Sequence, residues 1–300
     1  MYSRVYVEIT NICNMHCSFC HGHSRPLKVM SKENFSHILE QLTGVTGYIY
    51  YHLMGEPLTH PLLPEFLRMA AEKSFRSVIT TNGTLLQKRL PELLASPLHK
   101  LSISLHSFEG NSDEAFLEYL SQCAQCAQAT AQAGTITVLR LWNRGFDCGR
   151  NDTALQYLQR VLPGLWTPNT KGFRIQDKLF LEWGDRFQWP DLAAPLQGEQ
   201  VFCYGMQDQF GILCDGSVVP CCLDSNGVIT LGNVFQQPLA NILQTPRANA
   251  MRAGFSCRRA SEELCRRCGY AQRFSLPDPS FKNAADTAPK RHPQKRDKEN

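Results

Sequence analysis

The stretch of sequence that decides the fold reads Val5-Tyr6-Val7-Glu8-Ile9, followed after three residues by Cys13-Asn14-Met15-His16-Cys17-Ser18-Phe19-Cys20. Apolar and polar residues alternate over residues 5–9, which predicts a strand. That strand leads directly into a loop with three cysteines. Three close thiolates are soft ligands that suit an iron-sulfur cluster, zinc or copper(I). The sequence therefore predicts a metal site at the end of its first strand.

Segments typical of strands and helices alternate beyond this loop. Further strands are predicted at 48–53, 77–80, 101–105, 135–141 and 178–183, and helices at 31–42, 64–73, 85–94, 113–133 and 153–161. Such alternation implies a parallel sheet built from right-handed crossovers. A closed eight-unit barrel usually needs about 250 residues, and here only about 185 are used. We therefore predict an α/β fold, a partial (β/α)6 TIM-like barrel, with function on the loops at the carboxyl ends of its strands.

The pattern changes after about residue 195. Asp215-Gly216 separates two short apolar runs, 210–213 and 217–220, and predicts a β-hairpin. The segment is too small for a large core, so cysteine ligation could staple it. The predicted parts are a barrel over 1–195, a small cysteine-rich module over 196–273 and a disordered, Pro-rich and charged tail over 274–300.

Composition narrows the class of protein. The chain has 300 residues, of which 43% are hydrophobic and 19% charged, and this excludes wholesale disorder. No apolar run approaches the roughly 18 residues of a membrane span, and the N-terminus offers no signal peptide. We therefore expect a soluble, cytoplasmic protein with no membrane partner. The net charge of +4 falls mostly on residues 282–300, and the nearly neutral remainder argues against nucleic acid as a partner.

Thirteen cysteines are more than packing alone would explain. Disulfides are rare in cytosolic proteins, so we expect some cysteines to bind metal and others to be buried apolar residues. The buried residues are predicted to be Cys123, Cys126, Cys148, Cys214 and Cys257.

Four further motifs follow predicted strands in order. They are Met54-Gly55-Glu56-Pro57, Thr81-Asn82-Gly83, Ser104-Leu105-His106-Ser107 and Arg140-Leu141-Trp142-Asn143. Together with the three-cysteine loop, they resemble the motifs of the radical S-adenosylmethionine (SAM) superfamily over about the first 185 residues. An open partial barrel is the fold that this resemblance implies.

The resemblance also implies cofactors and site residues. A [4Fe-4S] cluster would be held by Cys13, Cys17 and Cys20, with SAM on the fourth iron. One electron, from a donor such as flavodoxin or ferredoxin, would cleave SAM to a 5′-deoxyadenosyl radical that abstracts a substrate hydrogen. The residues implied to contact SAM are Gly55, Glu56, Asn82, Ser104 and Arg140.

The residues alone leave alternatives open at this site. Zinc could replace the cluster, with a fourth ligand from His16, His21 or His23. Gly55-Glu56-Pro57 could be a simple turn, and Ser104 could be structural. Arg140 lies in an apolar strand, where a charge needs a partner, so a structural salt bridge competes with the SAM carboxylate.

A second group of cysteines lies near the end of the chain. Cys203, Cys221, Cys265 and Cys268 resemble the opening of the SPASM extension of radical SAM enzymes, but Phe274 stands where its next cysteine would fall. The resemblance is therefore to the shortened, twitch form, which implies one auxiliary [4Fe-4S] cluster for electron transfer. Cys222 is a rival ligand to Cys221, because adjacent residues in a strand point to opposite sides. A four-cysteine zinc site is the alternative.

The substrate is less defined than the cofactors. The resemblance implies a radical SAM oxidoreductase-type enzyme that dehydrogenates a small molecule, with a peptide- or protein-modifying maturase as the alternative. Residues 181–190 are rich in aromatic and charged side chains, which suits a ligand surface or a joint between the two domains. A non-catalytic iron-sulfur or zinc protein, with a redox or interaction function, would bind metal without binding SAM.

Overall fold

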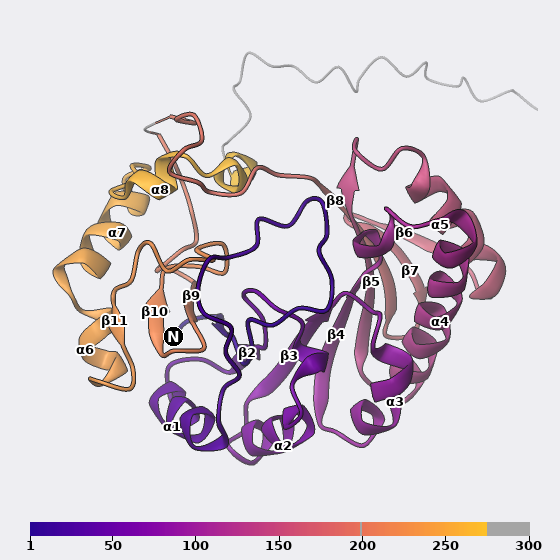
Figure 1. Ribbon diagram of the computed structural model, residues 1–300, viewed down its shortest axis with the longest axis horizontal. Coiled ribbons are helices and arrows are strands. Elements are labelled where there is room, and N and C mark those ends of the chain that lie inside the picture. The colour runs from indigo at the N-terminus through magenta and orange to yellow at the C-terminus, as the bar shows by residue number, and fades with distance from the viewer. Residues whose placement is uncertain (199, 275–300) are drawn as a thin grey trace, which may run out of the picture.

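A single curved sheet of eleven strands organises the computed structural model, which describes residues 1–198 and 200–274. The strand order is β11-β10-β9-β1-β2-β3-β4-β5-β8-β7-β6. The strands are β1 (Arg4–Val7), β2 (Tyr48–Tyr50), β3 (Arg76–Thr81), β4 (Leu98–Ser104), β5 (Ile136–Arg144), β6 (Thr167–Asn169), β7 (Gly172–Gln176), β8 (Leu179–Asp185), β9 (Gln209–Ile212), β10 (Ser217–Val219) and β11 (Gly232–Asn233). In Figure 1 the sheet curls into an open ring with its helices on the outside.

The six strands predicted for the barrel are all present, as β1 to β5 and β8, and each pairs in parallel with the next. The helices are α1 (Lys32–Leu42), α2 (Leu63–Glu72), α3 (Leu86–Leu94), α4 (Asp113–Gln132), α5 (Arg150–Val161), α6 (Leu239–Leu243), α7 (Pro246–Ser256) and α8 (Glu263–Arg266), with 3₁₀ turns η1 (Pro57–Thr59), η2 (Leu105–Phe108) and η3 (Gly269–Phe274). The Ser31 hydroxyl accepts a 3.2 Å bond from the backbone N–H of Asn34 and caps α1. The predicted α/β partial barrel is confirmed.

Two hairpins extend the sheet beyond the six parallel strands. At one edge, β6 and β7 pair antiparallel and β7 continues onto β8, an addition that the sequence did not predict. At the other edge, β9 lies parallel to β1, with Phe210 opposite Val5. The predicted hairpin of β9 and β10 is therefore part of the barrel sheet. The predicted tail, apart from Phe274, lies outside the described residues.

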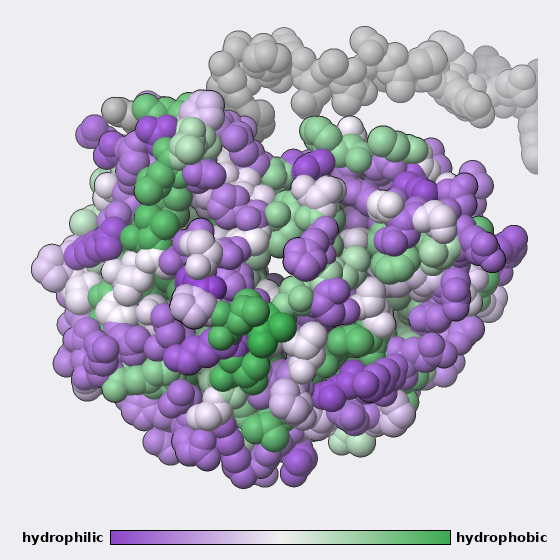
Figure 2. All heavy atoms as spheres, viewed as in Figure 1, coloured by the Kyte–Doolittle hydropathy of each residue, from purple (hydrophilic) through white to green (hydrophobic). Residues whose placement is uncertain are grey.

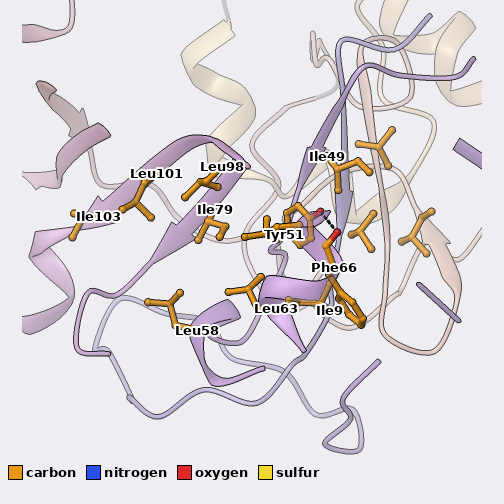
Figure 3. Close-up of a cluster of buried hydrophobic side chains, with 14 of the residues drawn as sticks. Ile9, Ile49, Tyr51, Leu58, Leu63, Phe66, Ile79, Leu98, Leu101 and Ile103 are labelled. Atoms are coloured by element: carbon orange, nitrogen blue, oxygen red, sulfur yellow. Dashed lines mark hydrogen bonds between the residues drawn. The ribbon is translucent and has the colours of Figure 1, made fainter. Parts of the chain in front are cut away.

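The main core fills the space between the sheet and its outer helices. Figure 3 shows Tyr51 and Phe66 in this core, with the Tyr51 hydroxyl donating to the backbone carbonyl of Phe66 at 3.4 Å. Phe35 stacks on Phe66 with ring centroids 4.1 Å apart. Burying each of these side chains contributes about 1.5–3 kcal/mol to stability.

Five cysteines outside the two metal motifs were predicted to be buried. Cys123, Cys126 and Cys214 are buried, as predicted, but Cys148 and Cys257 are exposed. Cys148 lies in the turn before α5 with φ of +48°, and Cys257 ends α7, so neither belongs to an apolar face. No helix in the described part of the chain has the length and apolar character needed to cross a membrane.

Candidate active site

The three-cysteine loop follows β1 and crosses the interior of the ring of strands in Figure 1, in indigo. Cys13 and Cys20 are exposed, Cys17 is half-buried, and all three are free thiols. Burial, followed by the charges of Cys20 and Cys13, raises the pKa of Cys17 to about 11. The three thiols are thus close enough to disfavour one another as thiolates, and a cationic soft metal centre would relieve that repulsion.

Gly55, in the loop after β2, packs directly against the backbone of the three-cysteine loop. Its φ is +76°, and a Cβ at this position would lie 2.4 Å from the carbonyl oxygen of Thr10. The next residue, Glu56, donates its backbone N–H to the Ile12 carbonyl at 2.9 Å. Only glycine allows the two backbones to come this close, so the Gly-Glu motif packs against the start of the three-cysteine loop and holds it in place.

The Glu56 side chain joins the loops that follow β2 and β3. One carboxylate oxygen accepts a 3.0 Å bond from the backbone N–H of Leu58, and the other accepts a 2.7 Å bond from that of Asn82. Burial raises the pKa of Glu56 to about 7, although these bonds oppose the shift. The carboxylate therefore positions two loops of the site, whether or not it also contacts SAM.

Asn82 links the Glu56 carboxylate to the three-cysteine loop. Its amide nitrogen donates to the Asn14 side chain at 3.0 Å and lies 3.9 Å from the Cys13 sulfur. Its backbone carbonyl accepts a 2.7 Å bond from the Tyr119 hydroxyl on α4. Asn82 is therefore held from both sides against the first cysteine of the motif.

Ser104 and Arg140 are direct neighbours across β4 and β5, and both face the interior of the barrel. Arg140 is half-buried, and desolvation lowers its pKa. Its Nε has no hydrogen-bond partner, and no carboxylate in the described part of the chain forms an ion pair with it. The guanidinium lies 3.6 Å from the centre of the Trp142 ring. Glu182 lies opposite Arg140 across β5 and β8, and its charge opposes this lowering of the Arg140 pKa, but the two side chains form no ion pair. The guanidinium can therefore still accept the SAM carboxylate as a partner.

A cavity of about 370 Å³ opens inside the barrel beside these residues. It reaches from Phe19 in the cysteine loop to Cys222 and Tyr270 in the C-terminal part of the chain. Figure 2 shows a hollow near the centre of the same face, with hydrophobic residues beside it. A volume of this size suits a small molecule.

The aromatic and charged segment 181–190 lines the cavity and also contacts both parts of the chain. Phe187 and Trp189 line the cavity. The Trp189 indole N–H also donates to the Phe19 carbonyl at 2.9 Å, and Phe187 packs edge-on against Tyr270 with centroids 4.9 Å apart. The segment thus joins the barrel, the cysteine loop and the C-terminal module around the cavity.

Sequence analysis assigned no function to several residues that line the cavity. They are Arg4, Tyr6, Tyr50, His52, Lys100 and Ser102. Burial, with a smaller contribution from the charge of Arg140, lowers the pKa of His52 to about 3. Burial also lowers the pKa of His106 to about 4. Those cavity residues that lie on strands could have been found from their alternation with buried apolar residues along each strand. In β1, for example, Val5 and Val7 face the outer helices, whereas Arg4 and Tyr6 face the interior of the barrel.

The C-terminal cysteines gather around a second, smaller cavity. Those that line it are Cys203, Cys221, Cys222, Cys265 and Cys268. Burial, then the charges of the other four cysteines, raises the pKa of Cys221 well above its ordinary value. Cys222 also lines the larger cavity, where its thiol interacts with the Tyr6 hydroxyl. Among residues 1–198 and 200–274, no three His, Cys, Asp or Glu side chains converge as the ligands of a single metal ion would.

Comparison with known proteins matches both parts of the chain. Residues 7–121 match the radical SAM superfamily, and residues 203–269 match SPASM, an iron-sulfur cluster-binding domain. The chain belongs to the radical SAM superfamily. It carries a C-terminal SPASM domain, and the two domains imply SAM, a [4Fe-4S] cluster and further iron-sulfur binding. The free thiols of the cysteine loop and the unpaired Arg140 fit these cofactors.

Individual relatives resemble the chain in part. The S-adenosyl-L-methionine-dependent 2-deoxy-scyllo-inosamine dehydrogenase of Niallia circulans is 30% identical over 115 residues, which cover 36% of this chain and 46% of that protein. The matches to several other curated relatives span about a third of their length.

The structure of BtrN in complex with AdoMet and 2-DOIA has a TM-score of 0.57 at 19% identity, covering 89% of this chain and 93% of that one. The structure of anSMEcpe with bound AdoMet and Kp18Cys peptide has a TM-score of 0.61 at 14% identity, covering 92% and 91%. These two likenesses show the fold alone.

Proposed function

We propose that the chain is a radical SAM oxidoreductase that removes hydrogen from a small molecule. The observation that carries this proposal is the single cavity that extends from Phe19, next to Cys20, to Cys222 and Tyr270 of the C-terminal module. A substrate in this cavity would lie between the two groups of cysteines. The volume of about 370 Å³ and the partial match to a relative named as a dehydrogenase favour a small molecule over a peptide.

The cofactors would be held by the two groups of cysteines and by the loops of the barrel. Cys13, Cys17 and Cys20 would bind the first cluster, and Cys203, Cys221, Cys265 and Cys268 the auxiliary one. When bound, SAM and the first cluster supply a 5′-deoxyadenosyl radical that takes a substrate hydrogen, and the auxiliary cluster supplies an acceptor for one electron.

The remaining residues bind and position the reactants. Arg140 and Ser104 would bind the SAM carboxylate, because the Nε of the guanidinium is buried without a hydrogen-bond partner and Ser104 lies next to it across β4 and β5. Gly55, Glu56 and Asn82 would fix the cysteine loop and the SAM amino group in place. Phe187 and Trp189 line the cavity and would help to exclude water from the reacting atoms.

Anaerobic reconstitution tests this function. We expect about eight irons per chain, as two four-iron cubes, and formation of 5′-deoxyadenosine and methionine from SAM with dithionite as reductant. Flavodoxin or ferredoxin would be the reductant in the cell. Replacement of Cys13, Cys17 and Cys20 by alanine should leave about four irons and abolish SAM cleavage.

Three results would contradict the proposal in different ways. If the triple variant keeps all its iron, the first cluster has been assigned to the wrong cysteines. About four irons and one zinc in the wild type would place zinc at the auxiliary site. Iron binding without SAM binding would favour a non-catalytic iron-sulfur protein.

A further inference from the structure

The cavity inside the barrel has an excess of positive charge. The charged residues in its lining are the cations Arg4, Lys100, Arg140, Lys171 and Arg186 and the single carboxylate Glu182. Arg4 pairs with Asp208 at 3.1 Å, and Arg140 is the residue proposed to bind the SAM carboxylate. Glu182, which also lies opposite Arg140 across β5 and β8, is the one carboxylate in this lining for the other three cations.

Lys100 is the cation most enclosed among the remaining three. Burial lowers its pKa, and the charges of Arg140, Lys171 and Arg4 lower it further, against the opposing effect of Glu182. No carboxylate in the part of the chain that the structure describes lies within ion-pairing distance of its ammonium group. A half-buried ammonium group surrounded by other cations is costly unless an anion joins it.

Lys100 also lies far enough from the SAM end of the cavity to bind a different molecule. It precedes Ser104 by four residues on β4, which corresponds to about 13 Å along the strand at ~3.3 Å per residue. Ser104 marks the end where Arg140 would bind SAM. Ser102, between Lys100 and Ser104 on β4, and Tyr50 on β2 also line the cavity, and their hydroxyls can donate to an anion.

We propose that the substrate is a small anion whose carboxylate or phosphate group binds beside Lys100 and Lys171, at the end of the cavity away from the three-cysteine loop. This inference rests on the proposed function, because it assumes that SAM occupies the Arg140 end of the same cavity. The reacting carbon would then lie between the two anion-binding ends. Lys100 is a binding residue in this arrangement and takes no part in the chemistry.

Chemical labelling of lysine tests the proposal directly. Reconstituted holoenzyme with SAM is treated with acetic anhydride in the presence of inorganic phosphate, malonate or neutral glycerol at equal ionic strength, and labelled peptides are quantified by mass spectrometry. We expect phosphate or malonate to slow labelling of Lys100 about threefold when present at about twice its dissociation constant, while glycerol has no effect. The more protective anion distinguishes a phosphate from a carboxylate substrate. Lys88, exposed on α3, should be labelled equally in all conditions.

A pair of variants supplies a second measurement. Lys100→Met removes the charge and keeps most of the side-chain length, so affinity for the protective anion should fall about tenfold in equilibrium dialysis. Lys88→Met is the matched control and should bind the anion as the wild type does. Equal affinity in both variants would overturn the proposal, as would equal labelling of Lys100 with all three additives.

SAM cleavage by the same wild-type preparation separates this inference from the proposed function. Cleavage of SAM without protection of Lys100 would overturn the anionic substrate and leave the radical SAM chemistry intact. Protection of Lys100 without cleavage of SAM would support an anion site and overturn the proposed function.

Discussion

The backbone N–H of Asn82 donates a 2.7 Å hydrogen bond to the carboxylate of Glu56, which is almost fully buried. The other carboxylate oxygen is bound by the N–H of Leu58. Both oxygens thus accept from backbone amides, and Asn82 in turn contacts Asn14 and approaches Cys13. The Gly-Glu motif, the end of β3 and the three-cysteine loop therefore form one connected support for the candidate SAM site.

Glu56→Ala should lower the affinity for SAM about tenfold, because it removes a charged acceptor from two backbone amides and loosens the loop that carries Asn82. The measurement is equilibrium binding of SAM to the reconstituted variant, with iron content determined on the same sample. Iron should remain, since Glu56 is not a ligand. Glu72→Ala, on the exposed side of α2, is the control. Unchanged SAM affinity in a folded Glu56→Ala variant would remove this residue from the site.

Gly55→Ala should destabilise the protein more than Gly44→Ala does. Both glycines have a left-handed backbone, with φ of +76° and +78°, and alanine there costs about 1–2 kcal/mol. Only Gly55 has backbone in the way, since a Cβ would lie 2.4 Å from the Thr10 oxygen, whereas nothing lies within 4 Å at Gly44. Thermal unfolding and iron content of the two variants measure the difference. Equal unfolding temperatures and equal iron would show that the contact with Thr10 is unimportant.

The sequence predicted the barrel well because its signals are local. Alternating strands, the Ser31 cap and the six-unit order depend on residues close together in the chain. The pairing of β9 with β1 joins residues about 200 positions apart, and no local pattern encodes it. The β6–β7 hairpin was also missed, because its short strands, Thr167–Asn169 and Gly172–Gln176, lack a clear apolar alternation.

The residues at the mouth of the candidate site could be predicted because their motifs are also local in the sequence. Motifs at strand ends placed Glu56, Asn82 and Arg140 around the mouth of the barrel, because parallel strands end at the same edge. The interior cations did not stand out, because Lys100 falls just before the strand predicted at 101–105, and its neighbours Arg4 and Lys171 come from distant segments. Their proximity exists only once the sheet has curled.

The half-buried His52 should make stability depend on pH. Burial and the charge of Arg140 lower its folded-state pKa to about 3, whereas an unfolded histidine has a pKa of about 6.5. The unfolded state therefore takes up a proton below pH 6.5 that the folded state refuses, and stability falls as pH falls. The loss due to His52 should reach about 1.4 kcal/mol at pH 5.5.

His52→Phe isolates this contribution, because phenylalanine keeps the aromatic contacts with Tyr6 and Tyr50 and cannot be protonated. Denaturant unfolding of wild type and variant at pH 7.5 and pH 5.5 gives the comparison, and His106 contributes equally to both proteins. A variant that loses as much stability as the wild type between the two pH values would contradict the pKa of His52.

The last prediction separates the two groups of cysteines by function. Cys265 and Cys268 lie in the small C-terminal cavity with Cys203 and Cys221, and four cysteines would satisfy all four irons of a cube. A fully ligated cluster has no vacancy for SAM. The variant Cys265→Ala/Cys268→Ala should therefore still form 5′-deoxyadenosine with dithionite but make no oxidised product, because the electron left on the substrate has no acceptor.

Folding is the main confounder for this double variant, and the structure offers a way to control for it. The C-terminal part of the chain is anchored to the barrel by the pairing of β9 with β1, which does not depend on the cysteines. Cys257→Ala changes an exposed cysteine of the same module that lies outside the cavity, and it should keep about eight irons and full turnover. If the folded double variant turns substrate over as the control does, the auxiliary cluster is structural only. If it cannot cleave SAM at all, electrons reach the first cluster through the auxiliary one, and the direction of electron flow proposed here is wrong.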